Sequence, residues 1–491
     1  MAMGFSGNQP FYRQDKNIQR LLRVLKDGLD AEFSTVKSSS IDLRTGESGN
    51  LCCFVLDYPR ACRIPSLAVM IRGSDRTTLS QIRRSCLVLC SCLAVSFFLS
   101  GCLIQQIGGA FSKEPEGLHQ DASARAKKLI DEAFEGIQPQ PWIDHHVHIV
   151  ALGTDGSGAF VNSKMRSWLH LIERLKFSVY VSAAGIKSLD TADQEYVARL
   201  VRLARNIPAP GKYHILAFDK HYNSDGSVNL EKTTFYVPNE YIFRLVHDYP
   251  DLFLPVISVH PYRPDALEEL EKWAEKGAKY IKWLPNAMGI DPASPRLDPF
   301  YKKMKARRMI LLSHAGEEQA VEAEEDQRLG NPLLLRKPLD YGLRVIMAHG
   351  ASLGNCIDLD SPAKGEVTCF DLFLRLMDEK KYDGLLFGEI SAQLQFNRMP
   401  GPISTLLKRQ DLHPRLVNGS DYPLPAINFL IRTGAMARDG FITAEERGYL
   451  NEIYDYNPLL FDFVLKRTMR HPQTGQKLAP SVFMANPGLE N

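Results

Sequence analysis

The sequence lacks an excess of either charge, because 59 Lys and Arg side chains are balanced by 57 Asp and Glu, leaving a formal net charge of +2. This balance gives no electrostatic reason to expect a nucleic-acid partner. Cysteine is nearly absent after residue 102, where only Cys356 and Cys369 remain, and these two lack the paired spacing of a structural zinc site. A hydrophobic content of 44% and a charged content of 24% are typical of a globular protein.

The sequence also lacks an apolar run that reaches the roughly 20 residues of a transmembrane helix. A run of 15 residues, Cys86 to Ser100, follows Arg83-Arg84 and leads into Leu99-Ser100-Gly101-Cys102. A basic start followed by a short apolar stretch predicts a secretory signal. Its last four residues resemble a bacterial lipobox, in which the cysteine, here Cys102, is lipidated. Because Leu103 rather than Asp follows, the resemblance implies a lipid anchor on the periplasmic face of the outer membrane. If the signal is not used, the chain stays in the cytoplasm.

The position of this signal bears on the start of the chain, because a signal segment belongs at an N-terminus. We expect residues 1–69 to be an over-extended start, with translation beginning near Met70. The alternative is that residues 86–104 form a buried helix or a signal anchor behind a real cytoplasmic segment. The expected order is then a signal segment over 70–101, a tether over 102–140 with a short helix over 122–134, a main domain over 141–470, and a tail over 471–491.

From residue 141 onward, apolar runs alternate with amphipathic helical patterns such as residues 264–277. This alternation predicts parallel β/α units. About 325 residues of it, without a Rossmann glycine fingerprint, predict an α/β fold of the (β/α)8 TIM-barrel type rather than a doubly wound sheet. Nine strand candidates exceed the eight places of a barrel, and either 177–184 or 213–219 is the surplus one. The candidates are 142–149, 177–184, 213–219, 252–259, 279–284, 309–314, 344–349, 385–391 and 416–421.

The first strand carries Asp144-His145-His146-Val147-His148. Side chains alternate faces along a strand, so His146 and His148 should share one face with Asp144, while His145 points away. Two imidazoles on one face provide half of a divalent metal site. The alternative is a histidine cluster used only for hydrogen bonding, since histidine is also an ordinary polar residue.

The later strands favour the metal interpretation, because each of five β/α units ends in one ionisable residue. These residues follow one another at intervals of 32, 35, 40 and 32 positions, close to one β/α unit each. The C-terminal ends of parallel barrel strands meet on the face where TIM-barrel active sites lie. The sequence therefore predicts one site built from Lys282, His314, His349, Glu389 and Asp421, together with the histidines of the first strand.

This set of motifs resembles the amidohydrolase superfamily over roughly residues 141–465, and Gly419-Ser-Asp-Tyr-Pro423 is similar to a branch that includes both hydrolases and decarboxylases. The resemblance implies one or two divalent ions, with zinc foremost. His146, His148 and Asp421 would bind the first ion, and His314 that ion or a second one. His349 would bind a second ion or act on the substrate. Lys282 would be carboxylated and bridge two ions, or pair with a substrate anion, or reach out to solvent at the barrel rim.

The resemblance implies hydrolysis of an amide, lactone or related ester bond in a small molecule, with Asp421 as general base and His349 also catalytic. Metal-activated water is the expected nucleophile. A metal-dependent decarboxylase is the alternative, favoured if Arg263 or Arg398 clamps a substrate carboxylate. A lipoprotein that binds metal or a ligand without turnover is the third interpretation, and the oligomeric state stays open. Residues expected to contact substrate lie just past strand ends: Asn286, Glu317 or its neighbour Glu318, Glu389 and Tyr422. Cys356 and Cys369 could form a disulfide in an oxidising compartment.

Overall fold

The computed structural model describes residues 113–137 and 141–490. The expected segments 1–69 and 70–101, and the lipidation site Cys102, lie outside the described residues. Within the described ranges, no helix is both long enough and apolar enough to cross a membrane.

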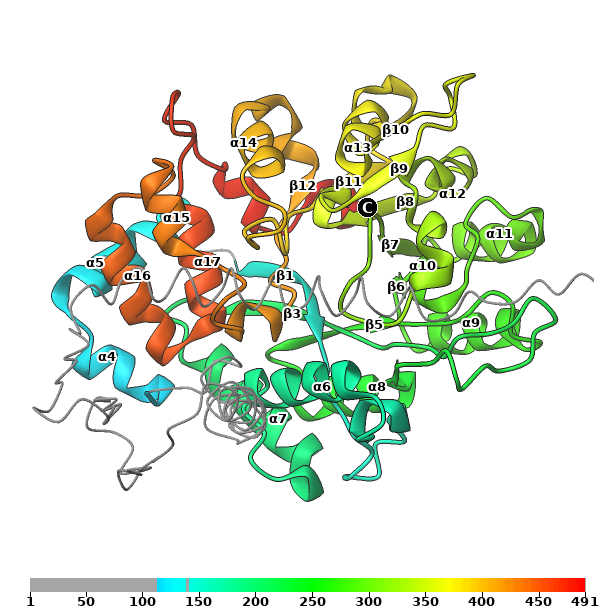
Figure 1. The fold of residues 1–491 in the computed structure, drawn as a ribbon, viewed down its shortest axis with the longest axis horizontal. Helices are drawn as coiled ribbons and strands as arrows, with labels where there is room; N and C mark the ends of the chain where they lie inside the picture. Colours follow the sequence, from blue (N-terminus) through cyan, green and yellow to red (C-terminus); the bar gives the residue numbers. More distant parts are fainter. Residues whose placement is uncertain (1–112, 138–140, 491) are drawn as a thin grey trace, which may run out of the picture. The chain divides into compact units, whose positions relative to one another are not determined.

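Eight parallel strands form the predicted barrel, with helices around it (Figure 1). The order of the strands in the sheet follows their order in the chain: β1 Trp142–His148, β3 Gly211–Leu216, β5 Phe253–Ile257, β6 Tyr280–Trp283, β7 Ile310–His314, β8 Arg344–Ala348, β11 Leu386–Glu389 and β12 Leu416–Val417. The segment after β12 closes the barrel on β1, because the backbone N–H of Asp421 donates to His146 (2.8 Å) and that of His148 donates to Tyr422 (2.9 Å). The prediction of a TIM barrel is confirmed.

Helices connect successive strands on the outside, as parallel pairing requires. They are α6 Leu171–Ala183 and α7 Ala192–Arg205 after β1, α8 Asn239–Asp248 after β3, α9 Ala266–Glu275 after β5, α10 Pro285–Met288 and α11 Asp298–Ala306 after β6, α12 Arg336–Asp340 after β7, α13 Cys369–Asp378 after β8, α14 Gly401–Lys408 after β11, and α15 Thr433–Arg438, α16 Ala444–Tyr456 and α17 Pro458–Thr468 after β12. The Thr443–Glu446 capping box opens α16. Pro458 then starts a separate helix, with Asn457 as its N-cap.

The surplus strand candidate is 177–184, of which residues 177–183 lie in α6. Its β-branched residues favoured a strand, but Ile172, Leu175, Val179 and Ala183 recur at helical spacing when the preceding turn is included. The helix buries Val179 and Ala183 in the outer core. Tertiary packing therefore overrode the local strand propensity.

The two ends of the described chain pack against the barrel. Before β1, η1 Pro115–Gly117, α4 Leu118–Asp121 and α5 Ala124–Phe134 precede the barrel, and the Phe134 ring stacks on Phe463 of α17 (4.5 Å between centroids). After α17, the predicted tail contains η11 Pro480–Phe483 and α18 Pro487–Glu490. Leu489 of α18 belongs to the apolar cluster inside the barrel, so this tail closes its N-terminal end.

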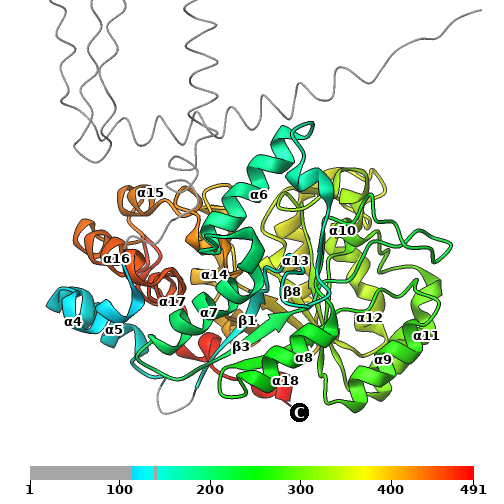
Figure 2. The same ribbon diagram turned by 90° about the horizontal axis from the view of Figure 1, so that it is seen from below.

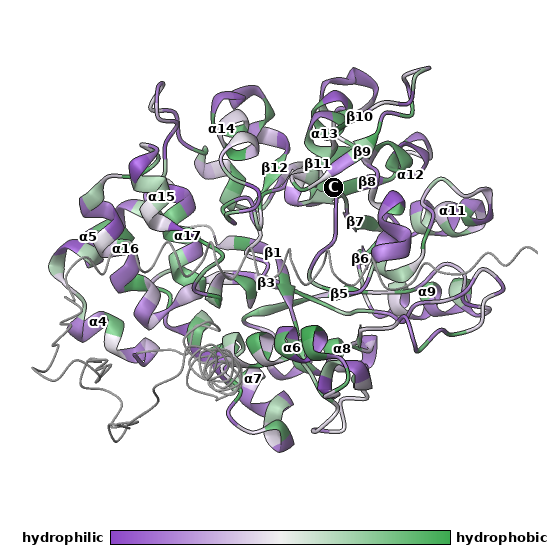
Figure 3. Ribbon diagram, viewed as in Figure 1, coloured by the Kyte–Doolittle hydropathy of each residue, from purple (hydrophilic) through white to green (hydrophobic). Residues whose placement is uncertain are grey.

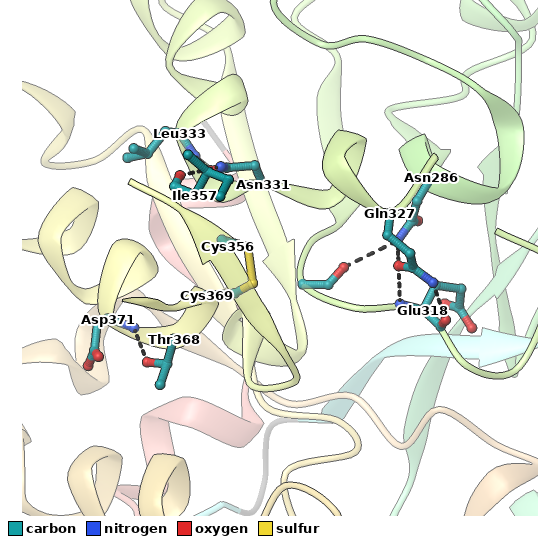
Figure 4. Close-up of a disulfide and its surroundings, with 11 residues drawn as sticks. Asn286, Glu318, Gln327, Asn331, Leu333, Cys356, Ile357, Thr368, Cys369 and Asp371 are labelled. Atoms are coloured by element: carbon teal, nitrogen blue, oxygen red, sulfur yellow. Dashed lines mark hydrogen bonds between the residues drawn. A yellow bond between two sulfur atoms is a disulfide. The ribbon is translucent and has the colours of Figure 1, made fainter. Parts of the chain in front are cut away.

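The loops contain short strands and 3-10 turns. Strands β2 Phe160–Val161 and β4 Phe235–Tyr236 pair with each other, as do β9 Asn355–Ile357 and β10 Glu366–Thr368. The Cys356–Cys369 disulfide joins β9 of the second hairpin to the first residue of α13 (Figure 4). Single 3-10 turns also occur: η2 Ser163–Arg166, η3 Leu189–Thr191, η4 Pro295–Leu297, η5 Glu324–Gly330, η6 Pro332–Leu335, η7 His349–Ala351, η8 Lys380–Tyr382, η9 Gln410–Arg415 and η10 Leu424–Ala426.

Candidate metal centre

A β-bulge in β1 changes which side chains face the barrel interior. Asp144 pairs in register with Tyr213, and His148 pairs with Leu216, so β1 takes four steps where β3 takes three. Leu216 belongs to the inner apolar cluster and Tyr213 to the outer core. Asp144 therefore lies on the outer face. The ring of His145 lies inside, 4.7 Å from that of His214. The expectation that Asp144 shares the face of the metal-binding histidines, with His145 turned away, is wrong, since simple alternation fails at a bulge.

Three candidate ligand atoms converge at the C-terminal end of β1. Nε2 of His146 lies 3.2 Å from Nε2 of His148, and the Asp421 carboxylate lies 3.2 Å from His148 and 3.5 Å from His146. Metal–ligand bonds of about 2.0–2.1 Å place tetrahedral ligand atoms about 3.3 Å apart. The three residues therefore already have the separations of a zinc-sized site.

Glu389 fixes the orientation of the His146 ring. Its Oε2 lies 3.0 Å from Nδ1 of His146 and accepts from the Ser391 hydroxyl (2.7 Å) and from the backbone N–H of His349 (3.2 Å). Burial raises the pKa of Glu389 to about 7. With Nδ1 turned to this carboxylate, Nε2 of His146 faces the other ligand atoms, which is the arrangement that supports a metal-bound histidine.

His146 and Glu389 also belong to a second group of potential ligands, which His349 completes. In that group Glu389 already accepts three hydrogen bonds, and Nδ1 of His349 lies only 2.7 Å from the Ser391 hydroxyl. These contacts occupy the atoms that an ion would need. His146, His148 and Asp421 are therefore the better candidates for an ion, and the contacts of Glu389 orient the ring of His146.

Lys282 is buried at the end of β6, with Nζ 3.2 Å from Nε2 of His146. The alternative of a lysine that reaches out to solvent is therefore wrong. Burial lowers the pKa of Lys282 to about 8, against the opposing effect of Asp421. A lowered pKa reduces the cost of placing this amine beside a cation, and it favours the neutral amine that carboxylation requires.

His314 and His349 complete a histidine cluster on the far side of His146. The ring of His349 lies 5.0 Å from that of His146 and 5.1 Å from that of His314. Neither ring nitrogen of His314 has a hydrogen-bond partner within the described part of the chain, although Glu318 Oε2 lies 3.5 Å from its Nδ1. Burial lowers the pKa of His314 to about 3 and that of His349 well below its ordinary range, so both imidazoles are neutral and able to donate a lone pair to an ion.

The turn that carries Asp421 is held by side chains of β1 and α17. Asp144 accepts from the backbone N–H of Ser420 (2.9 Å) and of His146 (3.0 Å), and Lys466 of α17 donates to the carbonyl of Gly419 (2.7 Å). A side chain at Gly419 would collide with the Glu389 carboxylate, which explains the glycine. Asp421 itself has a φ of 59°, a strained conformation that fits a position fixed for function.

The other residues predicted to contact a substrate are Asn286, Glu317 or Glu318, and Tyr422, and they lie in different surroundings. Asn286 is buried, donates to Gln327 and Gly316, and has no partner for its Oδ1 among the described residues (Figure 4). The side chain of Glu317 contacts Gln319, whereas its neighbour Glu318 points to His314. Tyr422 is fully buried in the outer core, with its ring 6.2 Å from that of Tyr196, so it is not placed to contact a substrate.

Sequence reasoning missed Ser391 and Lys466, and it could not place Arg398. Ser391 follows Glu389 at the alternate position that strand periodicity predicts, so its signal was present. Lys466 gave no signal, since it comes from a helix 45 positions after Asp421. Arg398 is buried and donates to Ser352 (3.0 Å), and its Nε has no partner among the residues described here. In addition to burial, its positive charge lowers the pKa values of His314 and His349, which places it beside the site.

Residues 143–362 match the amidohydrolase family. The matched range ends before Glu389 and Asp421, which the fold brings to the same site. The match covers 220 of the 491 residues and shows a likeness to this family over that range. No curated protein sequence matches the chain. The site residues inside the matched range are His146, His148, Lys282, His314 and His349.

Several solved structures show a distant likeness. An uncharacterised TIM-barrel protein from Bordetella bronchiseptica is 16% identical, with a TM-score of 0.39 over 64% of this chain and 99% of the other. A probable 2-pyrone-4,6-dicarboxylic acid hydrolase from Acinetobacter baumannii is 13% identical, with a TM-score of 0.38 over 64% and 99%. A 5-carboxyvanillate decarboxylase from Sphingomonas paucimobilis is 11% identical, with a TM-score of 0.38 over 65% and 100%.

Proposed function

We propose that this chain is a metal-dependent hydrolase of the amidohydrolase superfamily that acts on an amide, lactone or related ester bond of a small molecule. The observation that carries the proposal is the set of separations among His146, His148 and Asp421, 3.2 to 3.5 Å, which fits one divalent ion. Zinc is the first candidate because the donors are imidazole nitrogens and one carboxylate.

The bound ion would supply a Lewis acid that activates water and polarises a carbonyl. The Asp421 carboxylate lies 3.2 Å from His148, whose side chain is 29% exposed, and it would take a proton from water and return it to the leaving group. Glu389 holds the ring of His146 through Nδ1. Ser391 holds Nδ1 of His349, which leaves Nε2 as the ring nitrogen that could act on a substrate. Burial of these groups excludes bulk water from the site and strengthens each of these interactions.

A decarboxylase is the second candidate, and Arg398 is the observation that favours it. This arginine lies close enough to His314 and His349 to add to the lowering of their pKa values by burial. Arg263 instead pairs with Asp219 (3.3 Å) and Asp265 (2.8 Å). A buried guanidinium whose Nε has no partner within the described chain fits a carboxylate of a substrate. That carboxylate could be the group that leaves, or it could only position a bond to be hydrolysed.

The proposal extends to location, where we propose a lipid anchor at Cys102 on the periplasmic face of the outer membrane. The Cys356–Cys369 disulfide supports an oxidising compartment, since disulfides seldom persist in the cytoplasm. Mass spectrometry of the mature N-terminus tests this: a diacylglyceryl group on Cys102 is expected, and an unprocessed chain beginning at Met1 would contradict it.

Metal content per chain, measured by elemental analysis, tests the site. Two equivalents that fall to one in Lys282→Ala would support a binuclear site bridged by Lys282. One equivalent that persists in Lys282→Ala and His349→Ala, but not in His146→Ala, would support a mononuclear site. His247→Ala is the matched control, because that histidine is exposed and distant. A chain without metal would refute the proposal.

The reaction class is tested with a panel of aromatic carboxylates and of lactones or amides, following carbon dioxide release and acid release separately. Acid release without carbon dioxide supports the hydrolase. Carbon dioxide release supports the decarboxylase. In either case Arg398→Gln should raise KM for carboxylate-bearing substrates about 10- to 100-fold, the value of a charged hydrogen bond, with metal content unchanged.

A further inference from the structure

An exposed apolar cluster projects from the start of α6. Within four consecutive positions, the side chains of Trp168, Leu169 and Leu171 are 61%, 91% and 58% exposed. Single exposed apolar side chains are ordinary, but adjacent large ones mark an interaction site. Figure 2 shows α6 extending away from the barrel strands, and Figure 3 shows how apolar this helix is. We call these three residues the α6 tip.

Cations surround the α6 tip. Residues 163–176 contain four Lys or Arg side chains and a single acid, Glu173. The Arg174 guanidinium lies 3.6 Å from the centre of the Trp168 ring, and it donates to the carbonyl of Arg166 (2.9 Å). Tryptophan and leucine flanked by Lys and Arg are typical of segments that lie in the interface of a bilayer with anionic lipids.

The α6 tip is part of the rigid fold, not an unsupported loop. Lys176 donates to the carbonyl of Gln319 (2.8 Å), and the Tyr180 hydroxyl donates to that of Ala320 (2.9 Å). Both acceptors directly follow Glu318, which faces His314. The helix is therefore fastened to a loop of the candidate metal centre, at the end of the barrel where the strands carry their ionisable residues.

We propose that the α6 tip inserts into the interface of a phospholipid bilayer and docks this face of the barrel on the membrane. Only 11 positions separate Cys102 from Lys113, where the described structure begins, a length that spans at most about 40 Å. A chain anchored at Cys102 would keep the barrel within reach of the bilayer. Three side chains are too few for a stable dimer, which buries about 1,200 Å² or more. The proposal does not depend on the reaction that the site performs.

Trp168 provides its own probe, because the other three tryptophans of the chain, Trp142, Trp273 and Trp283, are at most 1% exposed. The full chain is mixed with vesicles of phosphatidylcholine and phosphatidylglycerol that carry bromine on their acyl chains. We expect the emission of Trp168 to shift to shorter wavelength and to be quenched. Vesicle-bound protein whose tryptophan emission is not quenched would overturn the proposal, because it would show attachment without docking. Protein that does not bind vesicles would overturn it as well.

The double variant Leu169→Glu/Leu171→Glu keeps the fluorophore and tests the contact. Losing the burial of two leucines should weaken docking at least a hundredfold and abolish the quenching. Leu359→Glu is the matched control, since Leu359 is 46% exposed elsewhere and should leave quenching unchanged. Sedimentation velocity tests the other possible partner of the α6 tip, a second copy of this chain. If the double variant converts a dimer into a monomer while quenching persists, the tip is a subunit interface and the proposal fails.

Discussion

The interior of the barrel has two layers with opposite chemistry, carried by the same strands. The lower layer is apolar and contains Leu216, Val256, Ile310, Leu312, Ile346, Phe387 and Val417. The upper layer is ionisable and contains the candidate metal centre. On β7 only two positions separate Leu312 from His314, and on β11 only two separate Phe387 from Glu389. On these two strands, an apolar core residue and a site residue are therefore neighbours on the same face of the strand.

The lower layer also contains two histidines, and they show what distinguishes the layers. Nδ1 of His145 lies 2.9 Å from Nδ1 of His214, and the ring of Tyr280 lies 4.4 Å from that of His214. No carboxylate accepts a hydrogen bond from either ring in the described chain. In the upper layer, by contrast, Glu389 orients His146 and Asp421 faces it. In the part of the barrel that the structure describes, the upper histidines have carboxylates beside them and the lower pair does not, which is why only the upper cluster is a candidate metal centre.

The strongest test of this separation is Leu312→Ala in the lower layer. Removing a fully buried leucine should lower the free energy of unfolding by about 2–5 kcal/mol, with the metal content unchanged. Urea unfolding with chelator and elemental analysis measure the two quantities. Val228→Ala is the control, since Val228 is 44% exposed and its truncation should change stability by less than about 0.5 kcal/mol. A loss of metal in Leu312→Ala would show that the two layers are not independent.

A second test weakens the upper layer without removing a ligand. Glu389→Gln keeps the shape of the side chain but loses the charge that supports His146, so metal affinity should fall about 10- to 100-fold. Competition with a chromophoric chelator measures the affinity. The exposed Glu366→Gln serves as the matched control. Unchanged affinity in Glu389→Gln would remove Glu389 from the support of the site.

The smallest expected effect concerns pH and the lower histidines. Burial lowers the pKa of His214 to about 3, below the ordinary value of 6.5. Between these two pH values, His214 is protonated in the unfolded chain and neutral in the folded chain. Stability contributed by neutral His214 is therefore complete above pH 6.5 and is lost as pH falls from there toward 3, by about 1.4 kcal/mol per pH unit.

The variant His214→Leu should remove that slope. Unfolding free energies of metal-free protein at about pH 5, 6 and 7, a range that crosses the ordinary histidine pKa, should fall less steeply in the variant than in the original chain. His247→Gln is the control, because His247 is exposed. Equal slopes in His214→Leu and the original chain would mean that folding does not lower the pKa of His214.

The orientation of side chains beyond the strand ends could not be predicted from the sequence, because it depends on contacts between elements. Glu317 and Glu318 are equivalent in the sequence, but Gln327 donates to the carbonyl of Glu318 (Figure 4), and only the Glu318 side chain faces His314. Glu389 and Tyr422 both lie near strand ends, yet one orients a ligand and the other packs outside the barrel. Sequence position relative to a strand end does not specify which way a side chain turns once the strand has ended.

The sequence by itself determined the strand order, the barrel and the residues that end its strands, because hydrophobic alternation is local and each apolar run carries its own period. It also determined the capping box at Thr443, which depends on positions only three apart. The tertiary structure decided the bulge that reversed Asp144 and His145, the helix at 177–183, and the turn held by Lys466 that places Asp421. Register and burial are collective properties of neighbouring strands and helices, so they exist only after those elements have packed together.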